Sequence, residues 1–486
     1  MIVSLLIISP LFTSNEIVVR RFAKGFCAFH FLYTILMLGF FNPENPYVSE
    51  LHFFGMDWIQ SLGIKFVFKI DAISMILSAL TSFVFLISII SSKFNIRKHH
   101  KFYYSMQMLL MSAILGIFTS GDMFLFFLFW ELEMIPAYFL IGGNFSNVTG
   151  NEFEGNPKKS AIKFILFTFT GSMFMLLGIL LLHYFNVISS GNITANFSEI
   201  FVQGIPMKIQ LFIMACLLVG FGVKLPFVPL HTWLPDAHTD ASTPVSMVLA
   251  GILLKTGGYG LYRFNYQLMP DAFRLIAPIL AIFAVISIIY TAFVCYTQTD
   301  IKRIIAYSSI SNMGLVLLGL CAFNQIGLTA SVFHMVAHAL VTCGLFMIAG
   351  IVYLRYKNRD INTLSGIASK MPRLFGFAVL IVLASIGVPL FAPFVGEILT
   401  IIGALNSDFS FILKACAILS LPLLILCSCY MLKFLHNSFY GIKSDISETV
   451  NDISIHEFIV LASVLAGLII FGLYPNALLN IIMGLN

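Results

Sequence analysis

Charged residues are rare in this sequence: only 10% of its 486 residues are Asp, Glu, Lys or Arg, whereas 59% are hydrophobic. A soluble domain cannot bury that much apolar surface. The shortage of charge therefore excludes a soluble globular protein. It predicts a polytopic membrane protein that is surrounded by the lipid bilayer.

Motifs for redox and nucleotide chemistry are also missing. The eight cysteines form no C-x-x-C pair and no Cys/His cluster at metal-ligand spacing, which argues against an iron–sulfur or zinc site. We find no Gly-rich phosphate-binding loop and no basic patch interleaved with aromatic residues, so neither a nucleotide nor a nucleic acid is an expected ligand. Since no loop is long enough to form a soluble domain, any chemistry is expected to take place within the membrane.

What the sequence does contain is a series of about fourteen apolar runs, each long enough to cross roughly 30 Å of hydrocarbon. Residues 1–14 lack the basic start and the small-residue cleavage site of a signal peptide, so we interpret them as a short first membrane segment, with a cleaved signal peptide as the less favoured alternative. The expected segments lie near residues 1–14, 24–41, 71–92, 104–121, 122–142, 160–185, 207–233, 241–264, 271–298, 303–323, 326–354, 373–405, 411–436 and 455–483.

The distribution of basic residues supports this arrangement, because loops on the inner side of a membrane are rich in Lys and Arg. With the N-terminus outside, 19 of the 27 basic residues lie in inner loops or at inner segment ends, and six lie on the outer side. The remaining two, Lys224 and Lys255, fall inside apolar runs. An even number of spans with both ends outside therefore fits the sequence.

Four ionisable residues lie deep within apolar runs: Glu131, Lys224, Lys255 and Glu397. A charged side chain at the bilayer centre costs about 2.5–3.5 kcal/mol on insertion scales, so such residues usually line an ion path or face a partner. Glu133 points roughly 200° around the helix from Glu131 and is not expected to share its face. An ion pair that fixes helix packing is the expected role of Glu133.

Prolines interrupt two of the predicted membrane helices. Pro226 follows Lys224 in the seventh segment, and Pro389 precedes Glu397 in the twelfth; a second proline stands close to each. Proline removes a backbone donor and clashes with the preceding turn, so both helices are expected to break. Two broken helices in the two halves of a chain are typical of internally repeated transporters with ion sites at mid-membrane.

His334 and His338 are four residues apart and therefore lie on one helix face. A metal site, two packing histidines and a proton relay are the three possible interpretations. We favour the relay because histidine titrates near neutral pH and no third metal ligand is near in sequence. His231 and His238 lie between the two buried lysines, where His231 is expected to support the relay and His238 to lie at its inner mouth.

Five motifs, in this order and spacing, resemble one known family. They are WELEMIP, VKLPFVPLHTWLPDAHTDASTPVSMVLAGILLKTGGYGLYRF, KRIIAYSSISNMG, MVAHAL and FVGE. The sequence resembles the antiporter-like membrane subunit M (chain 4) of NADH:quinone oxidoreductase, respiratory complex I, from about residue 65 to residue 440.

The resemblance implies an all-α polytopic membrane protein with about 14 transmembrane helices and two inverted five-helix repeats, each with a broken helix. The implied units are N-terminal transmembrane helices (1–103), a first inverted repeat with a half-channel (104–264), a second (265–436), and a C-terminal transmembrane helix (437–486). A multi-pass protein of a bacterial plasma membrane, a mitochondrial inner membrane or a thylakoid membrane fits this family.

The resemblance also implies roles for the buried residues. Glu131 pairs with Lys224 in the first half-channel. Lys255 is the central relay, His338 connects it to the second half, and Glu397 is the terminal proton donor or acceptor. The residues expected to support this path are His231, His238, His334, Pro226 and Pro389.

The implied function is proton translocation coupled to quinone reduction in a complex I-type NAD(P)H or ferredoxin:quinone oxidoreductase. No redox cofactor is expected in this chain; NAD(P)H, FMN and iron–sulfur clusters belong to partner subunits, and L-type and N-type antiporter-like subunits are the expected neighbours. The alternative is a Mrp-type cation/proton antiporter subunit without redox coupling. Glu397 argues against it, because those homologues generally have lysine there.

The sequence departs from the family pattern at several positions. Asn312 stands where histidine is common, which puts a proton role at that position in doubt. Leu390 and Pro393 replace glycines of the second break, so that bend is expected to be stiffer. Ala72 replaces the frequent glycine after an aspartate, which is a milder change.

Overall fold

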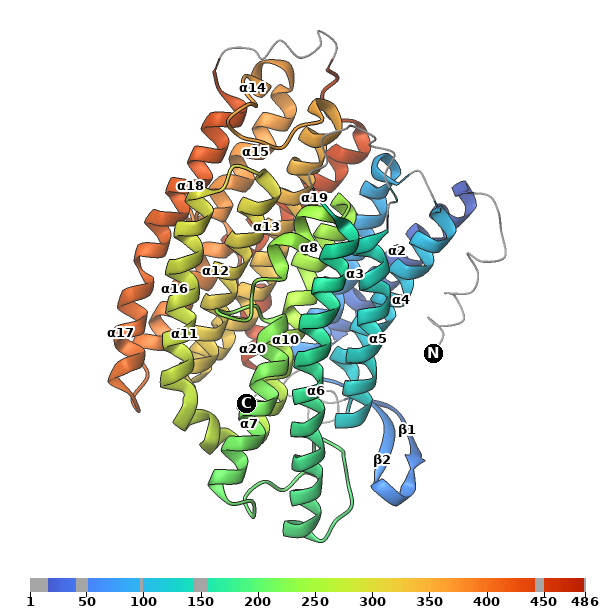
Figure 1. Ribbon diagram of the computed structural model, residues 1–486, viewed down its shortest axis with the longest axis vertical. Coiled ribbons are helices and arrows are strands. Elements are labelled where there is room, and N and C mark those ends of the chain that lie inside the picture. Colours follow the sequence, from blue (N-terminus) through green and yellow to red (C-terminus); the bar gives the residue numbers. More distant parts are fainter. Residues whose placement is uncertain are drawn as a thin grey trace.

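The computed structural model describes residues 16–40, 51–96, 99–143, 145, 155–441 and 450–484. These residues form a bundle of long helices with a small β-hairpin at one end (Figure 1). The first predicted segment, residues 1–14, lies outside the described residues.

The bounds of the helices follow the chain in order. They are α2 (Glu16–Phe40), α3 (Ala72–Asn95), α4 (His100–Thr119), α5 (Met123–Gly142), α6 (Pro157–Ser190), α7 (Met207–Lys224), α8 (Leu234–Asp240), α9 (Thr243–Val248), η3 (Leu249–Leu253), α10 (Leu254–Gly260), η4 (Leu261–Leu268), α11 (Pro270–Thr297), α12 (Ile301–Cys321), α13 (Gln325–Tyr356), α14 (Ile367–Lys370), α15 (Pro372–Ser385), α16 (Ala392–Leu405), α17 (Phe411–Ser420), α18 (Pro422–Phe439), α19 (Ile455–Leu473) and α20 (Asn476–Met483). A short 3₁₀ turn, η2 (Gln60–Leu62), joins the strands β1 (Leu51–Ile59) and β2 (Ile64–Ile70).

Aspartates begin three of the long helices. Asp71 caps α3 by accepting a hydrogen bond from the Ser74 amide, and the Ser74 hydroxyl in turn accepts one from the Asp71 amide. Asp122 and Asp300 cap α5 and α12 in the same way, each accepting from two amides of the first turn. Because the first amides of a helix have no partner within it, these caps fix where the helices begin.

Both helices that prolines were expected to interrupt are broken. Residues 225–233 separate α7 from α8, and residues 386–391 separate α15 from α16. Pro226 lies in the first gap and Pro389 in the second, where neither residue has to continue a helical hydrogen-bond ladder. The two predicted breaks are confirmed.

Among the described residues, twelve continuous helical runs are long and apolar enough to cross a membrane, and the interrupted pair α15 and α16 adds two shorter apolar helices. Every predicted segment from 24–41 onward coincides with one of these elements. The chain is therefore a multi-pass integral membrane protein built from helices. The count of fourteen spans, the inverted repeats and the domain boundaries stay predictions.

One element departs from the all-α expectation. β1 and β2 pair as a two-stranded antiparallel hairpin in the loop that precedes α3, and Gly63 takes the left-handed conformation at its turn. The signal was present as the β-branched and aromatic run IKFVFKI next to that glycine. The hairpin ends beside Asp71 and leads directly into α3.

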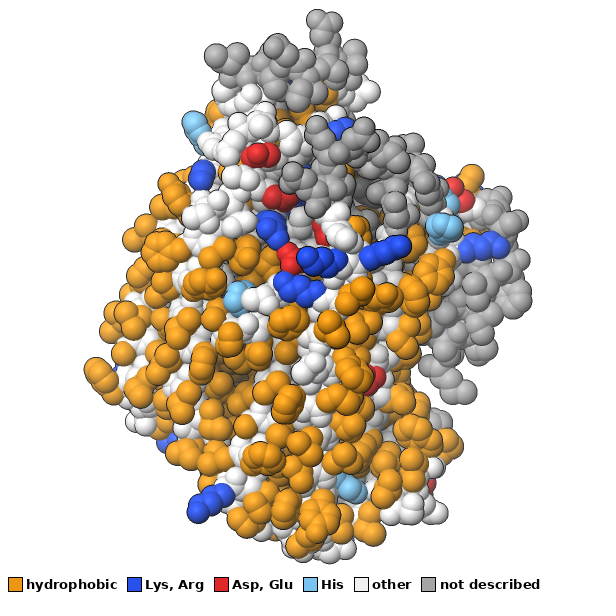
Figure 2. Space-filling view, viewed as in Figure 1, with side chains coloured by type: hydrophobic (Ala, Val, Ile, Leu, Met, Phe, Trp, Pro, Cys, Tyr) orange, Lys and Arg blue, Asp and Glu red, His pale blue; other side chains and the backbone are white. Residues whose placement is uncertain are grey.

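The outer surface is mostly apolar. Apolar side chains cover most of the face in Figure 2, and charged side chains gather toward its upper part. On α6, for example, Leu166 and Leu180 are exposed, and on α11 so is Ile279. Such faces suit the hydrocarbon of a bilayer, since in water they would cost the free energy of apolar exposure.

The centre of the bundle consists of two helical runs that protein surrounds on all sides. The run from α9 to η4 and the helix α13 are both fully buried within their most apolar windows. The helix α13 packs against α12, α16 and α19, and also against α9 and η3. Within these windows, polar side chains therefore face other protein groups and not lipid, as expected for functional residues in a membrane.

Candidate functional site

Lys224 is the last residue of α7 and stands at the first break. Its ammonium forms an ion pair with Glu133 of α5, and both side chains are buried. The Lys224 Nζ also lies 3.9 Å from the centre of the Trp130 ring. A carboxylate and an aromatic face together hold this buried cation.

Glu131 has a different position from the one expected. Its half-buried side chain interacts electrostatically with Lys224, but the ion pair goes to Glu133. Glu133 shares a helix face with Trp130, three residues earlier, and this face points toward Lys224. The expectation of a single Glu131–Lys224 pair is therefore corrected to one lysine near two carboxylates, with Glu133 as its direct partner.

A close approach of backbones brings Lys255 near the first break. A Cβ atom at Gly257 would lie 2.9 Å from the Lys224 carbonyl carbon and closer still to the Leu225 amide nitrogen. No side chain fits in that space, so glycine is required. The contact places α10, which carries Lys255, directly against the end of α7.

Lys255 is completely buried and contacts the other half of the chain. It lies on α10 between the two π-helical runs η3 and η4, a local geometry that is frequent at functional sites. Its Nζ donates to the Ala250 carbonyl at 2.6 Å and lies 2.8 Å from Nδ1 of His338. The structure thus brings together the two residues that we expected to form the central relay.

Beyond His338, polar side chains continue toward the second break. His334 Nε2 lies 3.1 Å from the side-chain oxygen of Asn312. A small cavity of about 10 Å³ is lined by Asn312, His338 and Ser385, among others. A cavity of this size holds about one water molecule, which can join His338 to Asn312.

Glu397 lies on α16, just beyond the second break, and is buried. Gly396 packs against His334, because a Cβ atom there would lie 2.8 Å from its Nδ1. Gly387, at φ +80°, lies so close to the Glu397 carboxylate that an added Cβ atom would collide with it. Glu397 Oε2 has no hydrogen-bond partner among the described residues.

His231 and His238 lie closer to the charged end of the bundle. The His231 ring meets the ring of Tyr290 edge-on at 5.8 Å and interacts electrostatically with Lys163. His238 is stacked on Phe346, with ring centres 5.2 Å apart, and is fully buried. Within the described residues, neither ring nitrogen of His238 has a hydrogen-bond partner.

The histidine pair of α13 is arranged for contacts other than metal binding. His338 contacts Lys255 and His334 contacts Asn312, as described above. In the part of the chain that the structure describes, no group of three or more His, Cys, Asp or Glu side chains is arranged to hold a metal ion.

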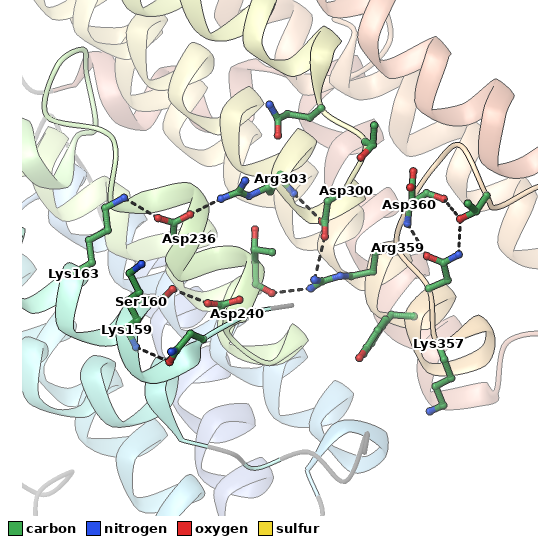
Figure 3. A pocket seen from close by; sticks show the side chains of 18 residues that line it. Lys159, Ser160, Lys163, Asp236, Asp240, Asp300, Arg303, Lys357, Arg359 and Asp360 are labelled. Atoms are coloured by element: carbon green, nitrogen blue, oxygen red, sulfur yellow. Dashed lines mark hydrogen bonds and ion pairs between the residues drawn. The ribbon is translucent and has the colours of Figure 1, made fainter. Parts of the chain in front are cut away.

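A large polar pocket, which the sequence did not predict, lies at the end where the basic loops meet (Figure 3). It has a volume of about 1060 Å³ and is lined from the start of α6, from α8, from the α11–α12 connection and from the end of α13. Asp236 pairs with Lys163 at 2.7 Å and with Arg303 at 2.5 Å. Asp240 accepts a hydrogen bond from Ser160 at 2.6 Å. The excess of basic residues in these loops predicted a common side, but not the aspartates that pair with them.

Comparisons with known proteins agree with this geometry. Residues 120–421 match the family described as NADH:quinone oxidoreductase/Mrp antiporter, TM. The chain is 38% identical to NAD(P)H-quinone oxidoreductase chain 4 1 of a Nostoc species, over 86% of this chain and 76% of the relative. It is 36% identical to the chloroplastic NAD(P)H-quinone oxidoreductase chain 4 of Chara vulgaris, over 97% of this chain and 94% of the relative.

Solved structures share the fold at lower identity. A chain of respiratory complex I from Thermus thermophilus with bound NADH superposes with a TM-score of 0.84 at 22% identity, over 100% of each chain. A chain of the Mrp complex from Dietzia sp. DQ12-45-1b superposes with a TM-score of 0.85 at 19% identity, over 99% of this chain and 95% of that chain. With the sequence match to the family and its relatives, the chain belongs to the NADH:quinone oxidoreductase/Mrp antiporter family of membrane proteins.

Proposed function

We propose that this chain is a proton-translocating membrane subunit of a complex I-type NAD(P)H:quinone oxidoreductase. Protons move along a row of buried groups that begins with Glu131, Glu133 and Lys224, continues through Lys255 and His338, and ends at Glu397. The observation that carries the proposal is the contact between Lys255 and His338, because it joins the two halves of the chain in its fully buried centre.

The first break supplies the Lys224 ammonium, a group that can release its proton. A buried ammonium is stable only while a carboxylate compensates its charge, and it gives up its proton when that partner moves away. Energy from electron transfer in partner subunits changes the positions of the Glu131 and Glu133 carboxylates relative to the Lys224 ammonium. The break after Lys224 leaves residues 225–233 free of a regular helical ladder, so this end of α7 can respond.

The centre of the row passes the proton on by short hydrogen-bonded steps. Lys255 exchanges a proton with His338 across 2.8 Å. Asn312 has no titratable proton, so the next step uses a water molecule in the cavity beside it, with His334 as the following group. Glu397 follows Gly396, the glycine that packs against His334, and it then binds or releases the proton.

The wider assembly follows from the same proposal. Residues 104–264 and 265–436 form two inverted repeats, each with one of the two broken helices, and L-type and N-type antiporter-like subunits are the neighbours. NAD(P)H, FMN and iron–sulfur clusters are held by other subunits. Two breaks in corresponding halves of the chain support this division.

A Mrp-type antiporter subunit without redox coupling is the competing function. The fold does not separate the two, since this chain superposes equally well on chains of both kinds of complex. Glu397 favours the redox-coupled subunit. Sodium-dependent proton efflux from vesicles that contain the chain with its co-assembled subunits, without any quinone-linked electron transfer, would establish the antiporter instead.

Proton translocation in membrane vesicles that contain the whole complex tests the proposal. Lys224→Ala and Glu131→Gln should each slow quinone-coupled proton translocation by at least about tenfold, as expected when a proton-carrying group is removed. Lys208→Ala, which removes an exposed lysine from the other end of the same helix, is the matched control and should leave it unchanged. Normal translocation in assembled complexes that carry the first two variants would contradict the proposal.

A further inference from the structure

Two backbone groups at the first break have lost the partners that a continuing helix would give them. In a continuing α-helix, the Phe227 amide would donate to the Val223 carbonyl. It donates instead to the Leu225 carbonyl at 2.7 Å. The Val228 amide also leaves the helical ladder and donates to a side chain. Backbone groups freed at membrane depth need partners inside the protein, so these partners determine where the end of α7 is held.

Trp233 supplies the partner of the freed carbonyl. Its indole Nε1 donates to the Val223 carbonyl at 2.8 Å, so this bond joins the residue before Lys224 to the residue before α8. The Trp233 side chain is completely buried. Its ring packs against the ring of Phe164 in α6, with the ring centres 5.3 Å apart. Because an indole has a single N–H donor, the position of the packed ring fixes the position of the carbonyl.

Ser287 of α11 supplies the partner of the freed amide. Its hydroxyl accepts a hydrogen bond from the Val228 amide at 2.9 Å and donates one to the Phe283 carbonyl of its own helix at 2.7 Å. The Ser287 side chain is completely buried. A hydroxyl has one proton and two lone pairs, so the bond to its own helix leaves the oxygen able to accept from the break.

Two ring contacts hold the break against the same face of α11. Phe283, Ser287 and Tyr290 are spaced four and three residues apart, so they lie on one side of the helix. The centres of the Phe283 and Phe227 rings are 6.2 Å apart. The Tyr290 ring meets the His231 ring edge-on, as described above. The Ser287 hydroxyl therefore lies between two further contacts of α11 with the break.

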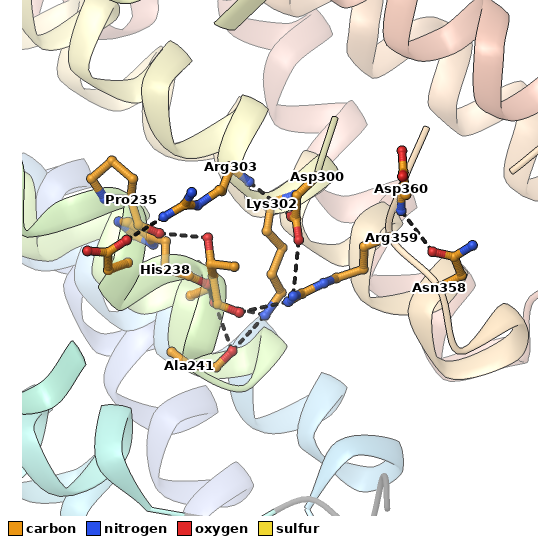
Figure 4. A network of polar contacts seen from close by, with 12 residues as sticks. Pro235, His238, Ala241, Asp300, Lys302, Arg303, Asn358, Arg359 and Asp360 are labelled. Atoms are coloured by element: carbon orange, nitrogen blue, oxygen red, sulfur yellow. Dashed lines mark hydrogen bonds and ion pairs between the residues drawn. The ribbon is translucent and has the colours of Figure 1, made fainter. Parts of the chain in front are cut away.

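The helix α8, which begins directly after Trp233, is fixed at its other end by basic side chains. Lys302 of α12 donates to the Ala241 carbonyl at 2.6 Å (Figure 4). Arg359, beyond the end of α13, donates to the Thr239 carbonyl at 2.8 Å. The Trp233 indole therefore reaches back to α7 from a helix that other elements hold in place.

From these contacts, and resting on the proposed proton row, we propose that Trp233 and Ser287 are positioning residues for Lys224. Their two hydrogen bonds replace the helical ladder and hold the end of α7 where the Lys224 ammonium meets Glu133. Neither side chain carries the proton. Two such bonds hold the chain less strongly than a continuous ladder, so the end of α7 has one preferred position and can leave it when the carboxylates move.

Two substitutions remove one bond each, and both are tested in vesicles that contain the whole complex. Trp233→Phe keeps an aromatic ring beside Phe164 but loses the N–H donor. Ser287→Ala removes only the hydroxyl that accepts from the Val228 amide. Each variant should slow quinone-coupled proton translocation, per assembled complex, by about three- to tenfold. This is the range expected when one hydrogen bond no longer favours the productive position.

Thr291→Val is the matched control. Thr291 lies one turn after Ser287 on α11 and is equally buried, and its hydroxyl donates to the Ser287 carbonyl at 2.6 Å. The substitution removes a buried hydroxyl and a hydrogen bond that does not involve the break, so translocation should stay normal. A loss equal to that of Ser287→Ala would mean that any buried hydroxyl of this helix matters, and it would overturn the proposal.

Combination with Lys224→Ala separates positioning from a general structural role. Residues that act through one group have non-additive effects, whereas independent defects multiply. Trp233→Phe and Ser287→Ala should therefore cause no further loss of translocation in a chain that already carries Lys224→Ala. A further loss of about three- to tenfold in the double variants would show a role that does not depend on Lys224, and it would overturn the positioning role.

The outcomes also distinguish this proposal from the proton row itself. If Lys224→Ala is slow while Trp233→Phe and Ser287→Ala translocate normally, the row stands and the positioning role is wrong. If Lys224→Ala itself translocates normally, the proposed function is wrong as well. Should Trp233→Phe fail to assemble, Ser287→Ala decides, because it removes a single oxygen atom from the interior.

Discussion

At the first break, the ammonium of Lys224 is paired with Glu133 and covered by the Trp130 ring. At the second break, Glu397 is equally buried, but its Oε2 has no hydrogen-bond partner among the described residues. A carboxyl group without a counter-charge is more stable as a neutral acid, whereas a paired ammonium and carboxylate are more stable as ions. The proton is therefore held by a paired ammonium at the first break and by a carboxyl group without a counter-charge at the second. The same type of substitution should have different consequences at each break.

The backbones of the two breaks differ as well. In the second break, Leu390 has a φ of +87°, a left-handed conformation that favours glycine, and it is 64% exposed. Gly387 has a φ of +80° and makes the close approach to the Glu397 carboxylate. The second break thus contains one residue that must be glycine and one that would be relaxed by becoming glycine.

Removal of the carboxylate at the first break should have the largest effect on stability. Glu133→Gln leaves the buried ammonium of Lys224 without its ion-pair partner, with only Glu131 nearby, and should cost about 3 kcal/mol. The amount of assembled chain in the membrane and its thermal unfolding midpoint in detergent measure this. An additional Lys224→Met substitution should restore most of the stability, and no such recovery would show that the pair is not the cause.

A side chain at Gly387 should have the next largest effect. Gly387→Ala forces a Cβ atom against the Glu397 carboxylate and places alanine at a positive φ, which together should cost about 1–3 kcal/mol. The same thermal unfolding measurement applies. Gly376→Ala is the matched control, because a Cβ atom there meets nothing within 4 Å and alanine favours the helix. Equal thermal unfolding midpoints for the two variants would contradict the close contact between Gly387 and the Glu397 carboxylate.

Relief of strain in the second break should give a smaller effect of the opposite sign. Leu390→Gly removes an unfavourable positive φ and, because the side chain is mostly exposed, loses little packing; it should stabilise the chain by about 1 kcal/mol. In contrast, Leu380→Gly, the same change within the helix α15, should destabilise it by a similar amount. A lower unfolding midpoint for Leu390→Gly would show that this leucine is not strained.

The carboxyl at the second break should matter least for stability and strongly for function. Glu397→Gln keeps the shape of the side chain and strands no counter-charge, so its stability should change by less than about 1 kcal/mol. Quinone-coupled proton translocation should nevertheless be lost, because glutamine does not exchange protons. A stable complex that translocates protons normally would remove Glu397 from the row.

The sequence could predict the features that depend on local rules. Prolines mark both breaks, because proline cannot continue a helix. The spacing of His334 and His338 predicted that both lie on one face of α13. The excess of Lys and Arg in the inner loops predicted that these loops lie at one end of the bundle. These are properties of a single segment, so one sequence is enough to find them.

Other features depend on how segments turn toward one another, which spacing alone does not give. Glu131 and Glu133 were correctly assigned to different faces of α5, but nothing in the sequence said which face meets Lys224. The signal was Trp130, which shares the face of Glu133. The pocket was missed for the same reason, because its lining comes from the start of α6, from α8, from the α11–α12 connection and from the end of α13.

We propose above all that a proton passes through Lys255 at the contact between the two halves of the chain. The most direct test is the rate of quinone-coupled proton translocation by the assembled complex with Lys255→Met, in sealed vesicles. The predicted result is a loss of at least about tenfold with normal amounts of the chain in the membrane. Translocation at the unmodified rate would contradict the account.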